Sequence, residues 1–204
     1  MKLYYCPGTC STGTHIVLEW IGRPYTTQRV TIQPPKSPEL LAVNPSAAVP
    51  VLDVDGWVLT QNAAILNYLA DTYPDAKLGG DGTPRSRAEV NRWMGLINSD
   101  VHPHFGTLFS AASWLGDPAA VRQVTQHSKT FIRKNFEILD KAMAGRHWLA
   151  GTRSIADPYL FVVLRWAKNM KLDLSGLAQL EAFFQGITAD AAVKKVLAAE
   201  DAHP

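Results

Sequence analysis

The feature that most limits how this chain can fold is a change of pattern near residue 78. Before it, short aromatic or β-branched runs alternate with helical patterns, in the order strand, helix, strand, helix, strand, strand, helix. Beyond it, the apolar residues recur at helical spacing. The segment 78–84 between the two halves holds three glycines and a proline. We therefore expect an α/β domain over residues 1–77, a linker over 78–84 and an all-helical domain over 85–204.

The strongest local signal in the first half is a β-hairpin. Asp55-Gly56 separates the apolar runs 49–54 and 57–59, and a D-G pair in that position favours a tight turn between two strands. Upstream, residues 3–5 and 26–32 are aromatic or β-branched and predict two further strands. These strands and the helices between them make a small α/β sheet domain.

The second half carries several helix signals. Residues 90–101 place apolar side chains on one helical face, and Pro103 is expected to kink the helix that continues from them. Asp117-Pro118 predicts another helix start. Residues 154–157 resemble a capping box, with Asp in place of the usual Glu. The following run, 159–164, is apolar all round, which indicates a buried central helix that is too short to cross a membrane.

Charge and the first residues exclude several classes of protein. Twenty basic and eighteen acidic residues give a net charge of +2, which does not favour nucleic acid or an anionic membrane as a partner. Pro7-Gly8 interrupts the start of the chain too early for a secretory signal. We expect a soluble, cytoplasmic protein.

Cys6 and Cys10 are the two cysteines of the chain. They are too few for a four-ligand zinc site without histidines nearby, so we expect no metal, and a disulfide between them would close a very small loop. Cys10 stands at the start of a helix that is predicted to end near Gly22. The helix dipole and the free N–H groups there favour an anion, so a lowered thiol pKa is expected. The alternative is that Cys10 is a small buried apolar residue.

Three further groups of residues could take part in binding or chemistry. The Val49-Pro50 bond is either a trans bond at an edge strand or a cis bond that turns the Val49 backbone toward a peptide ligand. Asn62 either caps a helix or helps its N-terminus to hold a carboxylate. His102 and His104 are either acid–base groups or ordinary surface or core histidines.

A set of large apolar residues either lines a ligand pocket or fills the core. Its members are Phe105, Leu108, Phe109, Trp114 and Trp166.

Taken in order, the motifs of this chain resemble those of bacterial beta-class glutathione transferases. Residues 4–11, Tyr-Tyr-Cys-Pro-Gly-Thr-Cys-Ser, resemble the family's opening strand, loop and helix start. The later matches are Asn44-Pro45, Val49-Pro50-Val51-Leu52, the run Thr60-Gln61-Asn62-Ala63-Ala64-Ile65, Ser154-Ile155-Ala156-Asp157 and Leu164-Arg165-Trp166-Ala167. The resemblance spans nearly the whole chain.

The resemblance implies a thioredoxin-like N-terminal domain, an all-α C-terminal domain, a homodimer, and glutathione as co-substrate without a metal. By that likeness, Cys10 contacts the glutathione sulfur or forms a mixed disulfide with it. Val49 pairs through its backbone with the tripeptide, just before a cis Pro50. Gln61 and Asn62 bind its γ-glutamyl end.

Other positions carry further roles by the same likeness. His102 falls on the active-site histidine, Tyr5 belongs to the glutathione-binding opening motif, and Lys36 corresponds to a basic residue near the glycyl carboxylate. Ser99 and Asp100 lie in the segment that approaches glutathione across the dimer. Three positions depart from the pattern: Cys6 is unusual in its loop, Asn62 replaces Ser or Gly, and Gly95 replaces a polar residue.

The function implied is a detoxifying transferase that conjugates glutathione to small hydrophobic electrophiles, with thiol–disulfide exchange through Cys10. One alternative is a binding protein of the same fold, which would be retained on glutathione without turnover. Another is a reductive dehalogenase or isomerase of the same superfamily, which would differ in its apolar pocket.

Overall fold

The N-terminal half is built on one four-stranded mixed sheet. The computed structural model describes residues 1–202, and the last two residues of the expected helical domain lie outside them. The strands are β1 (Lys2–Tyr5), β2 (Thr26–Arg29), β3 (Val51–Val54) and β4 (Trp57–Thr60), in the spatial order β2-β1-β3-β4. β1 runs parallel to β2 and antiparallel to β3, and β3 pairs with β4 as a hairpin.

The alternation of side chains along β1 assigns the two faces of the sheet. Leu3 and Tyr5 enter the main core with helices α1 (Ser11–Ile21) and α3 (Asn62–Thr72), whereas Tyr4 packs in a smaller cluster with Leu40 of α2 (Pro38–Val43). The fold is therefore a thioredoxin-like sheet covered by helices on both faces.

The predicted hairpin is confirmed. Asp55 and Gly56 have φ of 53° and 93°, and Asp53 Oδ1 accepts a hydrogen bond of 2.7 Å from the Gly56 N–H. β2 and β3 are shorter than expected: β2 ends at Arg29, and β3 begins after Pro50, whose nitrogen carries no hydrogen to donate to the ladder.

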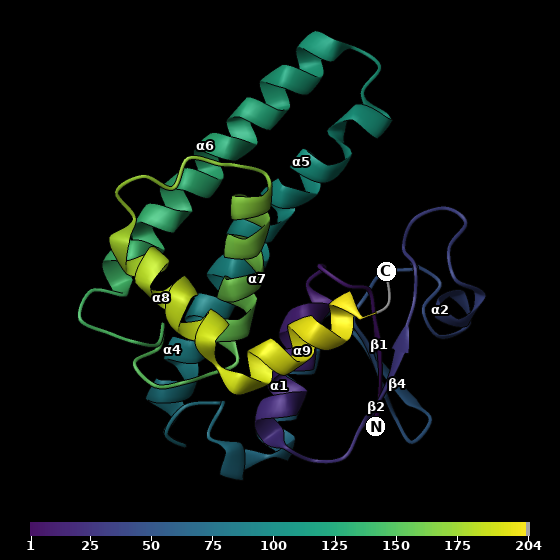
Figure 1. Cartoon of the computed structure of the whole chain (residues 1–204), viewed down its shortest axis with the longest axis vertical. Coiled ribbons are helices and arrows are strands. Elements are labelled where there is room, and N and C mark those ends of the chain that lie inside the picture. Colours follow the sequence, from purple (N-terminus) through teal and green to yellow (C-terminus); the bar gives the residue numbers. More distant parts are fainter. Residues whose placement is uncertain (203–204) are drawn as a thin grey trace.

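Within its described part, the regular elements of the C-terminal half are all helices. Its elements are α4 (Pro84–Gly95), a π-helical segment η2 (Leu96–Val101), α5 (His102–Trp114), α6 (Pro118–Ala142), α7 (Ala156–Asn169), α8 (Ala178–Ala189) and α9 (Ala191–Asp201), after the short 3₁₀ turn η1 (Pro74–Ala76). Figure 1 shows α5 and α6 extending from the body as a pair of helices, and α9 lying against α1. Within residues 1–202, none of the helices has the length and hydrophobicity to span a membrane.

The expected kink at Pro103 stays a prediction. Pro103 is the second residue of α5, which follows the π-helical segment η2 without a break. At the junction the His102 N–H donates to the Ile97 carbonyl, five residues back, as in a π-helix. That segment carries Asn98 and leads directly into His102.

Helix α7 is the predicted central helix, and α1 packs closely against it. Every residue from Tyr159 to Leu164 is buried. A Cβ added at Gly13 of α1 would lie 3.4 Å from the Pro158 carbonyl oxygen, in van der Waals contact with the α7 backbone, so the two helices approach closely there. The contact joins the sheet half to the helical half.

The carboxylate half of the predicted capping box at the start of α7 is confirmed, whereas the Ser154 hydroxyl accepts from the Ala156 N–H and not from the Asp157 N–H. Asp157 is completely buried, and its Oδ1 accepts from the Leu149 N–H at 2.8 Å. Its Oδ2 accepts from the Ser154 N–H at 2.7 Å and from the Ser154 hydroxyl at 3.0 Å. Both carboxylate oxygens therefore receive a backbone N–H.

We predict that Asp157→Asn lowers the free energy of unfolding by about 1 to 3 kcal/mol. The new amide nitrogen must face either the Leu149 N–H or the Ser154 N–H, so one buried donor loses its acceptor. The measurement is urea unfolding of the two proteins at one pH.

Asp190→Asn is the matched control at the start of α9. Its Oδ1 alone accepts from Ala192 N–H, Val193 N–H and the Trp20 indole, at 2.9, 3.1 and 3.1 Å. Because Asn retains that oxygen, its effect is expected to stay below about 1 kcal/mol. Equal losses from the two variants would contradict the explanation.

Candidate active site

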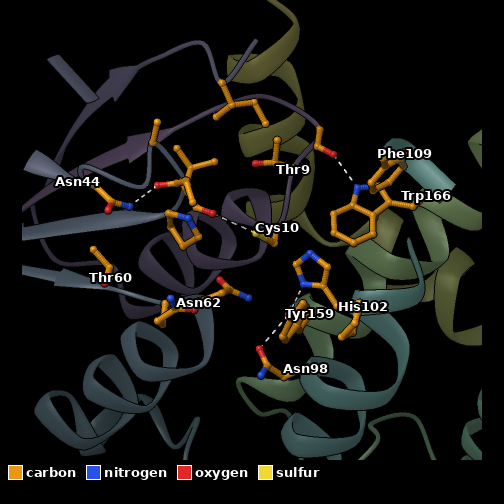
Figure 2. A pocket seen from close by; sticks show the side chains of 18 of the residues that line it. Thr9, Cys10, Asn44, Thr60, Asn62, Asn98, His102, Phe109, Tyr159 and Trp166 are labelled. Carbon is orange, nitrogen blue, oxygen red and sulfur yellow. Dashed lines mark hydrogen bonds between the residues drawn. The ribbon is translucent and has the colours of Figure 1, made fainter. Parts of the chain in front are cut away.

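A cleft of about 950 Å³ opens between the sheet half and the helical half (Figure 2). Its walls come from the loop before α1, the segment before β3, the start of α3, η2 and the beginning of α5, and the end of α7. It brings together eight of the predicted site residues from distant parts of the chain: Cys10, Val49, Pro50, Gln61, Asn62, His102, Phe109 and Trp166.

Cys10 lies directly before α1, and its thiol turns toward the sheet half of the cleft. Sγ donates a hydrogen bond to the Val49 carbonyl at 3.2 Å, and the residue is 8% exposed. Burial raises the pKa of the Cys10 thiol to about 12, although the N–H groups of Cys10 and Ser11 act in the opposite direction. The expected lowering of this pKa is therefore wrong, because desolvation outweighs the helix N-terminus.

The segment before β3 presents its backbone beside that thiol. The Val49-Pro50 peptide bond is cis, and both residues line the cleft. Asn44 supports the segment from behind, since its side-chain amide donates to the Ala48 carbonyl at 2.9 Å. The arrangement leaves an extended stretch of main chain facing the cleft.

The start of α3 forms the floor of the cleft. Gln61 precedes the helix with φ of 72°, a conformation that costs a non-glycine residue about 1 to 3 kcal/mol and that recurs at functional sites. The prediction that Asn62 caps α3 is wrong, because Asn62 is the first helical residue and its side chain makes no cap bond. Instead its Oδ1 accepts from the Thr14 hydroxyl at 2.8 Å, and its buried Nδ2 has no hydrogen-bond partner within residues 1–202.

His102 stands on the helical side of the cleft, and Figure 2 shows its ring between Cys10 and Tyr159. Its Nδ1 lies 2.6 Å from the Tyr159 hydroxyl, which donates to Asn98 Oδ1 at 3.2 Å. Because the hydroxyl has one proton, its oxygen accepts from His102 Nδ1–H, and Nε2 is left unprotonated. Burial lowers the pKa of His102 to about 4, so the ring is neutral near pH 7.

Two aromatic rings complete the helical wall. Trp166 packs against the His102 ring at 4.8 Å between centroids and against Phe109 at 5.3 Å. The Trp166 indole N–H donates to the Gly8 carbonyl at 2.7 Å, which fixes the ring against the loop that precedes Cys10. Phe109 is 56% exposed, so this part of the wall is open at the surface.

Several predicted pocket residues lie elsewhere. Phe105 is fully buried under Trp166 and Phe136, Trp114 is 59% exposed and bonds to Ser110, and Leu108 packs partly buried against the core. None of these three lines the cleft; of the predicted pocket residues on α5, Phe109 does.

The remaining predicted residues also lie outside this wall. Tyr5 is buried against the His15 ring, which corrects its expected place in the binding surface. Lys36 is exposed on the loop before α2. Ser99 and Asp100 are exposed on η2 and bond to each other at 2.5 Å. Cys6 is half-buried, and burial raises its thiol pKa.

Other lining residues were not recognised from the sequence. Asn98 and Tyr159 hold His102, and Thr9, Thr60, Asn169 and Met170 add to the walls. Tyr159 was expected as a core residue, and its hydroxyl is the polar signal that marks a second role. Asn169 and Met170 end α7 and carry no motif.

The cleft has both polar and apolar walls but carries no formal charge. Among the described residues that line it, none is Lys, Arg, Asp or Glu. The structure also shows no group of three His, Cys, Asp or Glu side chains within residues 1–202 that could hold a metal ion. Its donors are side-chain amides, hydroxyls and the free N–H groups of a helix start.

Comparison with known proteins identifies the family. A model of the glutathione S-transferase N-terminal domain matches residues 6–72, and one of the C-terminal domain matches residues 102–191. A glutathione S-transferase of Xanthomonas campestris pv. campestris is 51% identical over 201 residues, which cover 98% of each chain.

Solved structures agree with that match. A glutathione S-transferase from Xylella fastidiosa shares 46% identity and a TM-score of 0.93, with 98% of each chain covered. The bacterial beta-class enzyme of Sphingomonas chungbukensis shares 33% identity and a TM-score of 0.85, again with 98% of each chain covered. With a thiol before the first helix, a cis proline beside it and a histidine opposite, the chain belongs to the glutathione S-transferase family and is similar to its bacterial beta-class members.

Proposed function

We propose that this protein activates glutathione as a thiolate and adds it to small hydrophobic electrophiles, with thiol–disulfide exchange through Cys10 as a second capacity. The observation that carries the proposal is the convergence of a buried thiol, a neutral imidazole and a helix N-terminus on one cleft. Glutathione offers a matching set of groups: a sulfur, a peptide backbone and terminal carboxylates.

The sheet side of the cleft fits the tripeptide. The backbone of Val49, before the cis bond to Pro50, pairs with the ligand as a neighbouring strand does. The γ-glutamyl carboxylate takes the free N–H groups at the start of α3, where Gln61 and the unpartnered Nδ2 of Asn62 add donors. Lys36, on the loop before α2, attracts the glycyl carboxylate.

The proposed chemistry at the glutathione sulfur follows from the uncharged state of the Cys10 thiol and the His102 imidazole. Glutathione binds with its sulfur beside Cys10 and His102, and His102 Nε2 accepts the thiol proton. The thiolate that forms raises the pKa of the adjacent imidazole, since opposite charges stabilise each other in a desolvated site. The sulfur then attacks the electrophile, whose leaving group departs with its bonding electrons, and the proton passes from His102 to solvent.

Exchange uses Cys10 itself. The Cys10 thiolate attacks one sulfur of a glutathione disulfide, which forms a mixed disulfide and releases one glutathione thiolate. The raised pKa makes this reaction slow near neutral pH, because the reactive thiolate is scarce.

The electrophile occupies the aromatic wall of Trp166 and Phe109. Met170, 36% exposed, extends this apolar surface at the end of α7. Its open side suits flat hydrophobic molecules.

We further propose a homodimer. Trp57 and Val58 on β4 are 52% and 36% exposed, and Trp57 packs edge-on against Tyr68 of α3 at 5.2 Å. The two side chains point to opposite faces of this edge strand, and the surface that Trp57 forms with Tyr68 is of the apolar kind found at protein–protein contacts. In the dimer, Ser99 and Asp100 would approach the partner's glutathione.

The proposal extends to domain limits and cell compartment. We place the boundary between the two domains in residues 78–84, which run from shortly after η1 to the first residue of α4. Both cysteines are free thiols, which fits a reducing cytoplasm.

The site assignment predicts where glutathione attaches. After incubation with glutathione disulfide at pH 8.5, intact-protein mass spectrometry should show one added glutathione on the wild type and on Cys6→Ala, and none on Cys10→Ala. An adduct that depends on Cys6, or no adduct on any of the three proteins, would refute exchange at Cys10.

The raised pKa predicts the pH dependence of Cys10 modification. Below a pKa of about 12, the thiolate fraction grows about tenfold with each pH unit. The rate of Cys10 alkylation by iodoacetamide, followed by peptide mass spectrometry, should therefore keep rising about tenfold per unit from pH 7 to pH 9. Free glutathione, the reference thiol, levels off in this range, and a plateau for Cys10 near pH 7 would disprove the raised pKa.

His102 is predicted to act on turnover more than on binding. His102→Gln should lower kcat for conjugation of 1-chloro-2,4-dinitrobenzene about 100-fold, as expected for loss of a proton acceptor, with little change in KM for glutathione. His104→Gln is the matched control, because His104 lies on the same helix outside the cleft and bonds to Ser128. Unchanged kcat in His102→Gln would contradict the assigned role.

A further inference from the structure

The last helix of the chain reaches the loop that carries Cys10. Glu200, in the final turn of α9, is 3% exposed. Its Oε2 accepts from the Gly8 N–H at 3.1 Å and from the Thr12 hydroxyl at 3.0 Å. Its own carbonyl oxygen accepts from Arg29 on β2 at 3.4 Å. A side chain 192 residues away in sequence thus bonds to the active-site loop.

Gly8 is held from both sides. Glu200 takes its N–H, and the Trp166 indole donates to its carbonyl at 2.7 Å. Gly8 has φ of 72°, a left-handed conformation that favours glycine. Because Gly8, Thr9 and Cys10 all line the cleft, these two bonds fix one whole edge of it.

The packing of α9 against α1 does not by itself explain why the Glu200 carboxylate is buried. Two other polar bonds join α1 to α9: the Trp20 indole to Asp190 at 3.1 Å, and Lys195 to Glu19 at 2.8 Å. Neither contacts the Gly8 loop. A buried carboxylate costs desolvation free energy that an apolar side chain would avoid.

The contact of Glu200 with the His15 ring does not account for the buried carboxylate either. His15 Nδ1 lies 3.8 Å from Glu200 Oε1, and neither atom has a hydrogen-bond partner within residues 1–202. The short bonds of Glu200 are all made by Oε2, toward Gly8 and Thr12.

We propose that Glu200 is a positioning residue of the active site, which sets the place of the Gly8–Cys10 loop through the Gly8 N–H. The inference rests on the proposed glutathione chemistry for its catalytic meaning. It assigns to the C-terminal helix a part in the reactivity of Cys10, although Glu200 does not line the cleft.

The test compares Glu200→Leu with Glu200→Gln. Leucine keeps comparable volume but leaves Gly8 N–H and Thr12 without an acceptor, whereas glutamine keeps an oxygen that can accept from both. We expect Glu200→Leu to lower kcat for 1-chloro-2,4-dinitrobenzene 10- to 100-fold, since small displacements at a reacting centre are costly. Glu200→Gln should restore kcat to within about threefold of wild type.

A second readout needs no glutathione. Iodoacetamide alkylation of Cys10, mapped by peptide mass spectrometry, should become about tenfold faster in Glu200→Leu, because the released loop uncovers a thiol that burial now protects. Trp20→Phe is the matched control, since it removes another α1–α9 bond and should leave both readouts within about twofold of wild type. Thermal unfolding of every variant identifies a temperature at which all of them are folded, and both readouts are measured at that temperature.

The outcomes separate the two proposals. If the wild-type protein neither conjugates glutathione nor forms a glutathione adduct, the proposed function is wrong. The alkylation rates of Cys10 would still decide the role of Glu200. An active wild type with unchanged kcat and alkylation in Glu200→Leu would overturn the inference. So would equal effects in Glu200→Leu and Trp20→Phe, which would show loss of helix docking alone.

Discussion

Burial of helix α1 is the constraint on which the rest of this structure depends. Its residues from Ser11 to Leu18 are all buried, with the sheet on one side and α7 and α9 on the other. Buried hydroxyls must find partners inside the protein, and each of those on α1 bonds to a different segment. Ser11 bonds to the Cys6 carbonyl, Thr12 to Glu200, and Thr14 to Asn62. The same helix that fills the core therefore also bonds to the loop before Cys10, to the end of α9 and to the start of α3.

That burial also decides the charge state of the site. A helix start favours a thiolate at Cys10, and desolvation opposes it more strongly, so the thiol is neutral near pH 7. His102 is neutral for the same physical reason. Because the Cys10 thiol and the His102 ring are both uncharged and no charged side chain lines the cleft, they attract each other only weakly before a ligand binds. In the proposed mechanism, charge then develops on the glutathione sulfur, where the newly protonated His102 ring stabilises it in a site of low dielectric constant.

The sequence predicted the local features well, because each depends on residues close together in the chain. Asp55-Gly56 specifies its hairpin, the Asp157 carboxylate makes its half of the capping box, and the apolar run at Tyr159 requires burial on all sides. The sequence-based predictions failed where the place of a side chain depends on which face of a helix it occupies or on how far solvent reaches it. Asn62 was expected to cap α3 and instead bonds to Thr14, and Phe105 fills the core while Phe109 reaches the cleft.

By itself, the sequence determined the family and the two halves of the fold. It also identified Cys10, Val49, Pro50, Gln61 and His102 as candidates for the site, because each lies in a motif of neighbouring residues. Only the tertiary structure decided which side chains meet in the cleft. The pair Asn98 and Tyr159 behind His102, and the bond from Glu200 to Gly8, join segments far apart in the chain. Protonation states were likewise decided in three dimensions, because desolvation depends on everything packed around a group and not on its neighbours in sequence.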